Sequence, residues 1–180
     1  MKWLIISDLH GSFASTRQVL KYYKSNNIDK ILILGDILYH GPRNSLPEDY
    51  NPKSLAELLN TYKDIIISIK GNCDSEVDQM VLNFSIENST YYFFENNREF
   101  LACHGHHLEK NLSKYKNDIC IIHGHTHIPK AEKINDRIYL NPGSISLPKD
   151  GHPKTFSVLD NNKFTIYLLD TFEKYMEINL

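Results

Sequence analysis

The pattern of apolar and polar positions divides the chain into two halves of different character. In the first half, short continuous apolar runs at residues 3–7, 30–34 and 64–70 alternate with stretches in which apolar residues recur at helical spacing. A short continuous apolar run is typical of a strand that is covered on both faces. The pattern therefore predicts a strand–helix–strand–helix–strand order, in which right-handed crossovers make the strands parallel.

Helix signals lie between these runs. Ser12 is predicted to cap a helix that continues to about residue 25, with these side chains facing the core: Phe13, Val19, Leu20 and Tyr23. Pro52 suits the first turn of a second helix, and a short third helix is predicted at residues 76–82. The segment 37–51 carries no such signal, and a loop of this length is more often functional than idle.

In the second half, pairs of strand-like runs are separated by Asn-Asn or Asn-Asp, which is typical of antiparallel hairpins. The pairs are 90–95 with 98–103, 130–134 with 137–140, and 155–159 with 163–169. A buried strand is also predicted at 118–122 and an edge strand at 175–178. The two halves together predict an α/β fold of two packed sheets with helices outside.

Composition narrows the class of protein. The 180 residues are 41% hydrophobic and 23% charged, which is ordinary for a soluble globular chain, and this length suits a single domain spanning 1–180. The net charge is −2 without a Lys/Arg block, so neither a nucleic-acid nor a membrane partner is expected. The apolar runs are too short for a membrane span or a signal peptide, and three cysteines without paired spacing fit reduced thiols. We therefore expect a cytoplasmic protein.

Potential ligand side chains follow several of the predicted strands. In open α/β sheets, ligands bind just outside the carboxyl ends of the strands. The last two histidines of the segment 121–127 stand two apart, so in extended backbone their side chains would leave the same face. The residues at these strand ends are Asp8, His10, Asp36, Asn72, His104, His125 and His127.

Seven oxygen and nitrogen ligands exceed what one ion needs, and they suit two divalent ions that share a carboxylate. Imidazole with oxygen, and no thiolate, favours manganese, iron or zinc over calcium. Two ions bring four positive charges and the carboxylates of Asp8 and Asp36 return two, so the remaining charge can hold a hydroxide and a phosphate. Each residue alone is better explained as a cap or a turn; their shared position makes a metal site the better interpretation.

Five motifs occur in the order found in calcineurin-like metallophosphoesterases, which the chain resembles over nearly its whole length. They are Asp8-Leu9-His10, Gly35-Asp36, Gly71-Asn72-Cys73-Asp74, His104-Gly105-His106 and Gly124-His125-Thr126-His127. The short length and the segments around His40, Cys73 and Asn141 resemble the YfcE-type bacterial phosphodiesterases of this family.

The resemblance implies a four-layer αββα sandwich and activity that is commonly manganese-dependent. It also implies that one ion is held by Asp8, His10, Asp36 and His127, and the other by Asp36, Asn72, His104 and His125. Asp36 would bridge the two ions. The implied reaction is hydrolysis of a small phosphodiester through in-line attack by a metal-bridging hydroxide.

One position departs from the pattern of the wider superfamily. Most members have a histidine, followed by an acid that orients it, where this chain has Cys73 and Asp74. A thiol is a weak proton donor, so we expect a preference for diesters whose leaving groups need no general acid. His40, Arg43 and His106 are further catalytic candidates, and a surface or loop-packing role is as good an explanation for each.

Other functions are compatible with the same set of candidate metal ligands. A phosphomonoesterase would use the same ions, whereas a nuclease is disfavoured by the lack of a basic stripe. The fold also serves as a protein-binding scaffold in the retromer subunit that resembles these enzymes, but that role predicts eroded ligands, and all seven are retained here. The aromatic residues within 90–95 fit either an interface between copies in a homo-oligomer or core packing. His123 is predicted to be structural.

Overall fold

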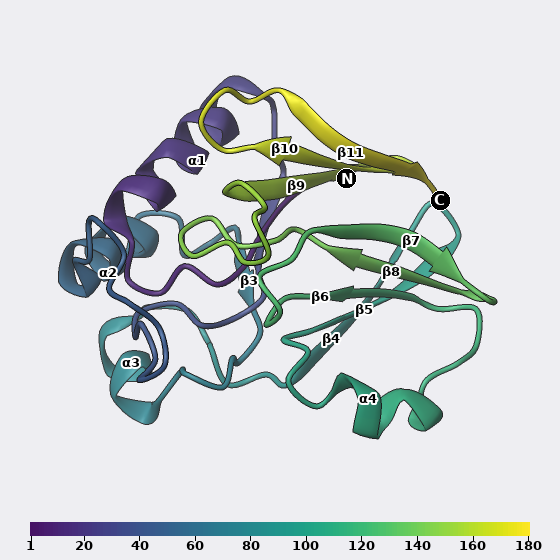
Figure 1. The fold of residues 1–180 in the computed structure, drawn as a ribbon, viewed down its shortest axis with the longest axis horizontal. Helices are drawn as coiled ribbons and strands as arrows, with labels where there is room; N and C mark the ends of the chain where they lie inside the picture. The colour runs from purple at the N-terminus through teal and green to yellow at the C-terminus, as the bar shows by residue number, and fades with distance from the viewer.

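The computed structural model describes residues 1–180, and its strands form two sheets packed face to face (Figure 1). The six-stranded sheet has the order β11-β10-β9-β1-β2-β3, and the five-stranded sheet has the order β4-β5-β6-β8-β7. The first contains β1 (Lys2–Ile6), β2 (Lys30–Ile33), β3 (Ile66–Ser68), β9 (Thr155–Asp160), β10 (Lys163–Leu168) and β11 (Lys174–Asn179). The second contains β4 (Thr90–Glu95), β5 (Arg98–Cys103), β6 (Cys120–His123), β7 (Lys130–Ile134) and β8 (Arg137–Asn141).

Both sheets are mixed. β1, β2 and β3 are parallel, as are β5, β6 and β8, and the remaining pairs are antiparallel. The predicted hairpins are present, and the tail forms the edge strand β11. Each sheet therefore has parallel central strands whose carboxyl ends carry the polar loops.

Helices cover the outer face of each sheet (Figure 1). They are α1 (Phe13–Ser25), α2 (Pro52–Asn60), α3 (Glu76–Val81), α4 (Leu108–Asn111) and the 3₁₀ turn η1 (Leu112–Lys114). The four-layer αββα sandwich expected from the sequence is confirmed. No helix has the length and apolar character that crossing a membrane requires.

The alternation of side chains along the strands explains the continuous apolar runs. In β1, Leu4 and Ile6 pack toward the helices, whereas Trp3 and Ile5 pack between the two sheets. All four are almost fully buried. A smaller cluster under α4 and η1 fills the outer face of the second sheet. Both faces of β1 are covered, as its pattern predicted.

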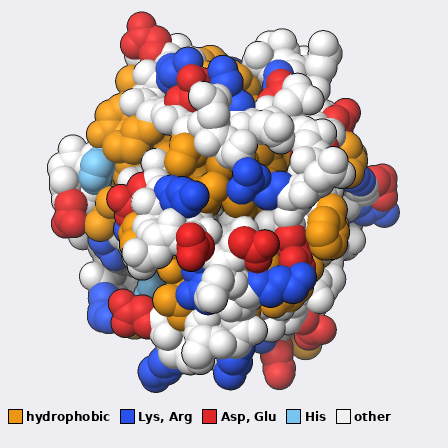
Figure 2. All heavy atoms as spheres, turned by 90° about the vertical axis from the view of Figure 1, so that its right-hand side faces the viewer, with side chains coloured by type: hydrophobic (Ala, Val, Ile, Leu, Met, Phe, Trp, Pro, Cys, Tyr) orange, Lys and Arg blue, Asp and Glu red, His pale blue; other side chains and the backbone are white.

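Some local details differ from what the sequence predicted. Ser12 is the N-cap residue of α1, but its side chain forms no capping hydrogen bond. Of the predicted core residues, Tyr23 packs against the core but is only partly buried, as is Phe13, whereas Tyr22, which was not predicted, is buried. Residues 108–114, for which no element was predicted, form α4 and η1. The aromatic strand β4 exposes Tyr92 and Phe94 to solvent. On the face seen in Figure 2, basic and acidic side chains are interspersed rather than gathered by sign.

Candidate metal centre

The loops after the parallel strands converge and bring the predicted ligands together. Three groups of side chains have ligand atoms within 4.8 Å of one another: Asp8 with His10 and His127, Asp8 with Asp36 and His104, and His10 with Asp36 and Cys73. Except for Cys73, which is half-buried, every member of these groups is buried. The loops of both sheets therefore build one polar cluster.

Each of three imidazoles is oriented by a backbone carbonyl. His10 Nδ1 lies 2.8 Å from the carbonyl oxygen of Tyr39, and His104 Nδ1 lies 2.7 Å from that of Leu34. His127 Nδ1 contacts the carbonyl of Leu147 in the same way. Since a carbonyl only accepts, each Nδ1 carries the proton and each Nε2 presents a lone pair to the cluster.

These lone pairs face other acceptors. His10 Nε2 and His127 Nε2 lie 3.3 Å apart, and His104 Nε2 lies 3.0 Å from Asn72 Oδ1. With Nδ1 protonated, no proton is available between either pair of atoms. Such an arrangement is unfavourable alone and favourable around a cation, so the donor set fits divalent metal ions.

The two carboxylates complete the cluster. Asp8 Oδ2 accepts from Ser7 Oγ at 2.7 Å and from the backbone N–H of His125 at 3.0 Å, whereas Asp8 Oδ1 is buried without a hydrogen-bond partner. Asp36 Oδ1 accepts from the backbone N–H of Cys73 at 2.8 Å. Asp36 Oδ2 lies 3.7 Å from His10 Nε2 and 3.5 Å from His104 Nε2. The Asp36 carboxylate thus stands between imidazoles from the two sheets.

Two predicted ligands lie at the open side of the cluster. Asn72 is exposed, and its amide donates to Cys73 Sγ at 3.2 Å. His125 is half-buried, outside the three close groups, and its ring centroid lies 5.1 Å from that of His104. Burial and the nearby His104 lower the pKa of His125, which favours the neutral imidazole that a metal requires.

The backbone at these ligands is not extended. The ligand residues with left-handed φ are Asp8 (53°), His10 (47°), Asp36 (53°), His125 (67°) and His127 (61°). The expectation that His125 and His127 leave one face of an extended strand was therefore wrong, because β6 ends at His123. Their side chains are placed by the turns that follow the strand.

The cluster opens into a cleft of about 870 Å³ between loops of both sheets. Among the catalytic candidates, Asp36, Arg43, Cys73 and Asp74 line this cleft. His40 does not: its ring packs edge-on against Tyr39 and Tyr50. His106 is exposed outside the cleft beside His104, and burial of part of its ring together with the neighbouring histidines lowers its pKa to about 4.

Cys73 and Asp74 differ in their surroundings. Burial, and then the carboxylate of Asp36, raise the pKa of the Cys73 thiol to about 12, so it is a very weak proton donor. Asp74 is buried and accepts backbone N–H groups of Asp36, Ile37 and Gly71 at 2.7 to 2.9 Å. Burial raises the pKa of Asp74 even though these hydrogen bonds lower it. Asp74 therefore joins the loops after β2 and β3 and orients no histidine.

Sequence reasoning missed several residues of the site. The hydroxyls of Ser144 and Ser146 both donate to the backbone carbonyl of Asp8 at 2.8 Å, and Lys149 lines the cleft. The turn that starts at Asn141 was noted in the sequence but assigned no chemistry. His123 is buried and lies 3.3 Å from the amide of Asn141, away from the ligand set, as a structural histidine would.

Comparisons with known proteins define the class. The model of the calcineurin-like phosphoesterase superfamily domain matches residues 1–163, and the chain belongs to this family. It is 40% identical to phosphodiesterase YfcE of Escherichia coli over 94% of this chain and 93% of that one. The solved structure of the E. coli protein matches with a TM-score of 0.94 and 38% identity, covering 99% of both chains.

Two more distant proteins are also similar to this chain. Phosphodiesterase MJ0936 of Methanocaldococcus jannaschii is 26% identical over 91% of this chain and 95% of that one. Vps29 of Entamoeba histolytica, solved in complex with Zn²⁺, shares the fold with a TM-score of 0.66 and 20% identity over 99% of each chain. The expected family is confirmed, and the chain is a phosphodiester hydrolase of a metal-dependent family.

Proposed function

We propose that this hydrolase cleaves a small phosphodiester with two divalent ions bound at the candidate metal centre. Asp8, His10, Asp36 and His127 would hold one ion, and Asp36, Asn72, His104 and His125 the other. The observation that carries this proposal is the set of facing lone pairs, in which His10 Nε2 and His127 Nε2 lie 3.3 Å apart without a proton between them. The position of Asp36 Oδ2 between His10 and His104 supports its role as the bridging ligand.

When bound, the ions would lower the pKa of a water molecule to about 7 and stabilise charge on the phosphoryl oxygens. The protein's own residues position these parts. The carbonyls of Tyr39, Leu34 and Leu147 fix the imidazoles, while Ser7 and the N–H of His125 fix Asp8. In-line hydrolysis would then need little further movement of the protein.

Arg43 and Lys149 are the substrate-binding candidates. Both are exposed, line the cleft and have side chains without a hydrogen bond or an ion pair. An arginine can bind two phosphate oxygens at once, whereas a lysine acts as a point charge. We assign Arg43 to a non-bridging phosphate oxygen and Lys149 to a further contact with the negative charge of the substrate.

We further propose that manganese is the ion used in the cell, with iron and zinc as alternatives, and that residues 1–180 act as one cytoplasmic domain. Carboxylate and amide oxygens mixed with imidazole suit manganese. Phosphomonoesters are the alternative substrates on the same core. A diester is favoured by the relatives from E. coli and M. jannaschii, which are named phosphodiesterases.

The decisive experiment is a screen of phosphodiesters and phosphomonoesters with metal-depleted protein reconstituted with Mn²⁺, Zn²⁺ or Fe²⁺. Asp36→Asn should lose at least a hundredfold in kcat and bind fewer than two ions per chain, because the shared ligand is weakened. Asp118→Asn is the matched control, since Asp118 is exposed and lies just before β6, at the opposite end of that strand from the site. Full activity and two bound ions in Asp36→Asn would disprove the two-metal assignment.

A further inference from the structure

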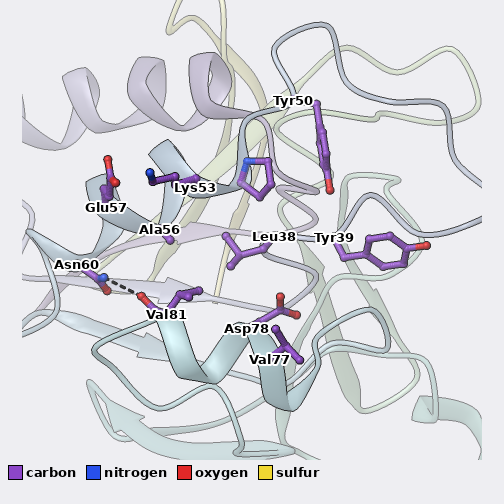
Figure 3. A pocket seen from close by; sticks show the side chains of 11 residues that line it. Leu38, Tyr39, Tyr50, Lys53, Ala56, Glu57, Asn60, Val77, Asp78 and Val81 are labelled. Atoms are coloured by element: carbon purple, nitrogen blue, oxygen red, sulfur yellow. Dashed lines mark hydrogen bonds between the residues drawn. The ribbon is translucent and has the colours of Figure 1, made fainter.

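A second concavity lies beside the metal cleft, between α2, α3 and the loop after β2 (Figure 3). We call it the apolar hollow; its volume is about 440 Å³. Its apolar lining includes Leu38, Tyr39, Ala56, Val77 and Val81. A concavity of this size with apolar walls and a few polar groups is typical of a small-molecule site.

The walls of the hollow expose apolar surface that the fold leaves uncovered. Helix α3 has no buried side chain, and its Val77 and Val81 are 67% and 49% exposed. Leu38 and Ala56 are buried, and Figure 3 shows Leu38 between the two helices. Asn60 donates to the carbonyl of Val81 at 2.9 Å, which fixes α3 against α2 (Figure 3). The α3 wall of the hollow is therefore fixed against α2 at its carboxyl end.

The hollow adjoins the metal cleft. Tyr39 lines both, and its carbonyl oxygen lies 2.8 Å from Nδ1 of the proposed ligand His10. Leu38 comes two residues after Asp36 in the same loop. Ser75, which caps α3, lines the metal cleft. The hollow and the cleft therefore share a wall at Tyr39, next to the proposed ligand His10.

The charges at the hollow select for a neutral occupant. Lys53 and Glu57 stand one helical turn apart on α2, and Asp78 accepts from Ser75 in the capping box of α3. The three charges sum to −1, Lys53 is the single cation of the lining, and no arginine is present, in contrast to the cleft with Arg43. This charge balance disfavours a second phosphate, whereas an alkyl or aryl group would bury apolar surface.

We propose that the apolar hollow is a substrate subsite that binds a neutral, apolar alcohol group of the phosphodiester. This inference rests on the proposed function and adds the class of the substrate: one side of the diester is an alkyl or aryl ester. Val77 and Val81 are specificity-determining residues, because they form the exposed apolar wall and touch no proposed metal ligand.

The test is a series of alkyl p-nitrophenyl phosphates from methyl to octyl, measured with Mn²⁺-reconstituted protein. The leaving group is constant, so kcat should stay unchanged, while kcat/KM should rise about two- to fourfold for each methylene that enters the hollow. Val77→Asp and Val81→Asp should each lower the octyl-to-methyl ratio of kcat/KM at least tenfold. Met80→Asp is the matched control, because Met80 lies on the same helix, is 83% exposed and does not line the hollow.

The outcomes separate the inference from the proposed function. No metal-dependent hydrolysis of any ester would contradict the proposed function. Hydrolysis with a flat dependence on chain length, or an equal loss in Met80→Asp, would overturn the subsite alone. Sedimentation equilibrium tests whether a second copy of the chain covers the hollow instead. If the wild type is an oligomer that Val77→Asp dissociates, and wild-type rates do not depend on chain length, the hollow is an interface between copies and the subsite is excluded.

Discussion

Left-handed backbone is a shared property of five of the seven proposed ligands: Asp8, His10, Asp36, His125 and His127. For residues other than glycine this conformation costs about 1–2 kcal/mol each. Short polar side chains tolerate it best, and β-branched ones least. The residue types at these positions are therefore constrained by the backbone as well as by metal chemistry, so a threonine or valine there should harm folding in addition to binding.

We expect Cys73 to determine which leaving groups the enzyme accepts. Because its thiol is a very weak acid, Cys73→His should raise kcat about tenfold or more for diesters with poor leaving groups, which is less than the roughly hundredfold effect of a well-positioned general acid. Diesters with good leaving groups should change little. The measurement is log kcat against leaving-group pKa for a series of aryl diesters, whose slope should become shallower in the variant.

Cys73→Ser is the control, since a hydroxyl keeps the size but supplies no acid near neutral pH. The explanation that the site lacks a general acid would be contradicted if wild-type rates were independent of leaving-group pKa while chemistry is shown to be rate-limiting. A folded, fully metallated Cys73→His that gains nothing on poor leaving groups would contradict it as well.

Gly71 allows the loops after β2 and β3 to approach closely. A Cβ at Gly71 would lie 2.1 Å from Asp36 Oδ1 and 2.3 Å from the Asp36 nitrogen, so Asp36 would have to move. Gly71→Ala should therefore cost about a hundredfold in kcat/KM. Gly151→Ala is the comparison, because a Cβ there meets nothing within 4 Å and adds only backbone strain. Equal activity in the two variants would remove the steric argument.

For single residues, the sequence predicts which side chains are candidate ligands better than it predicts how these side chains are oriented. Asp8, Asp36 and His104 could be proposed because each follows an apolar run. Their orientation could not, because the carbonyl that fixes His104 belongs to Leu34, 70 residues away. Lys149 carried no signal either, since a lysine in a turn has no pattern that distinguishes a cleft from open solvent.

Among the elements, the parallel strands β2 and β3 are joined at their carboxyl ends by Asp74. Its two oxygens accept three backbone N–H groups, one of them from Asp36 itself. Asp74→Asn must turn an N–H₂ group toward at least one of these donors. We expect a loss of about 1–3 kcal/mol in the free energy of unfolding and a ten- to hundredfold weaker affinity for Mn²⁺.

Urea denaturation and calorimetric titration with Mn²⁺ measure the two effects. Asp78→Asn serves as control, because the side chain of Asp78 accepts hydrogen bonds only in the capping box of α3. Unchanged Mn²⁺ affinity in Asp74→Asn, together with a loss of stability, would mean that Asp74 supports the fold and not the ligand geometry.

The elements themselves were predicted where one pattern dominates. β1 and β2 are fully covered apolar runs, and the hairpins are bounded by asparagine turns, so both signals are strong. The turns α4 and η1 were missed because segments of three or four residues are too short for a helical period. The joining of β9 to β1, which places the last hairpin beside the first strand, depends on contacts distant in sequence.

For the whole molecule, the candidate metal centre lowers the stability of the metal-free protein, although the sandwich around it is well packed. The two sheets enclose an apolar core, while their loops gather two carboxylates and several imidazole lone pairs without counter-charges. Burying such acceptors costs free energy unless a cation is present. The protein should therefore be appreciably stabilised by divalent ions.

Substitution of Asp8 can show whether this residue lowers the stability of the metal-free protein while it increases the affinity for metal ions. Its Oδ1 is buried without a hydrogen bond and lies 3.4 Å from His127 Nε2, whose lone pair points toward it. In Asp8→Asn, an amide N–H₂ at this position can donate to His127, while the other atom still accepts from Ser7 and His125. With a chelator present, the variant should therefore be more stable than wild type by about 1 kcal/mol, which is roughly 2–4 °C in Tm for a chain of this size.

With Mn²⁺ the order should reverse. An ion at a hundred times its Kd stabilises the wild type by about 2.7 kcal/mol, and Asp8→Asn should gain much less because a charged ligand has been lost. Thermal unfolding of both proteins in chelator and in Mn²⁺ gives all four values. A lower Tm for Asp8→Asn in chelator would mean that the buried carboxylate stabilises the metal-free fold. An equal Mn²⁺ gain in both proteins would mean that Asp8 is not a ligand.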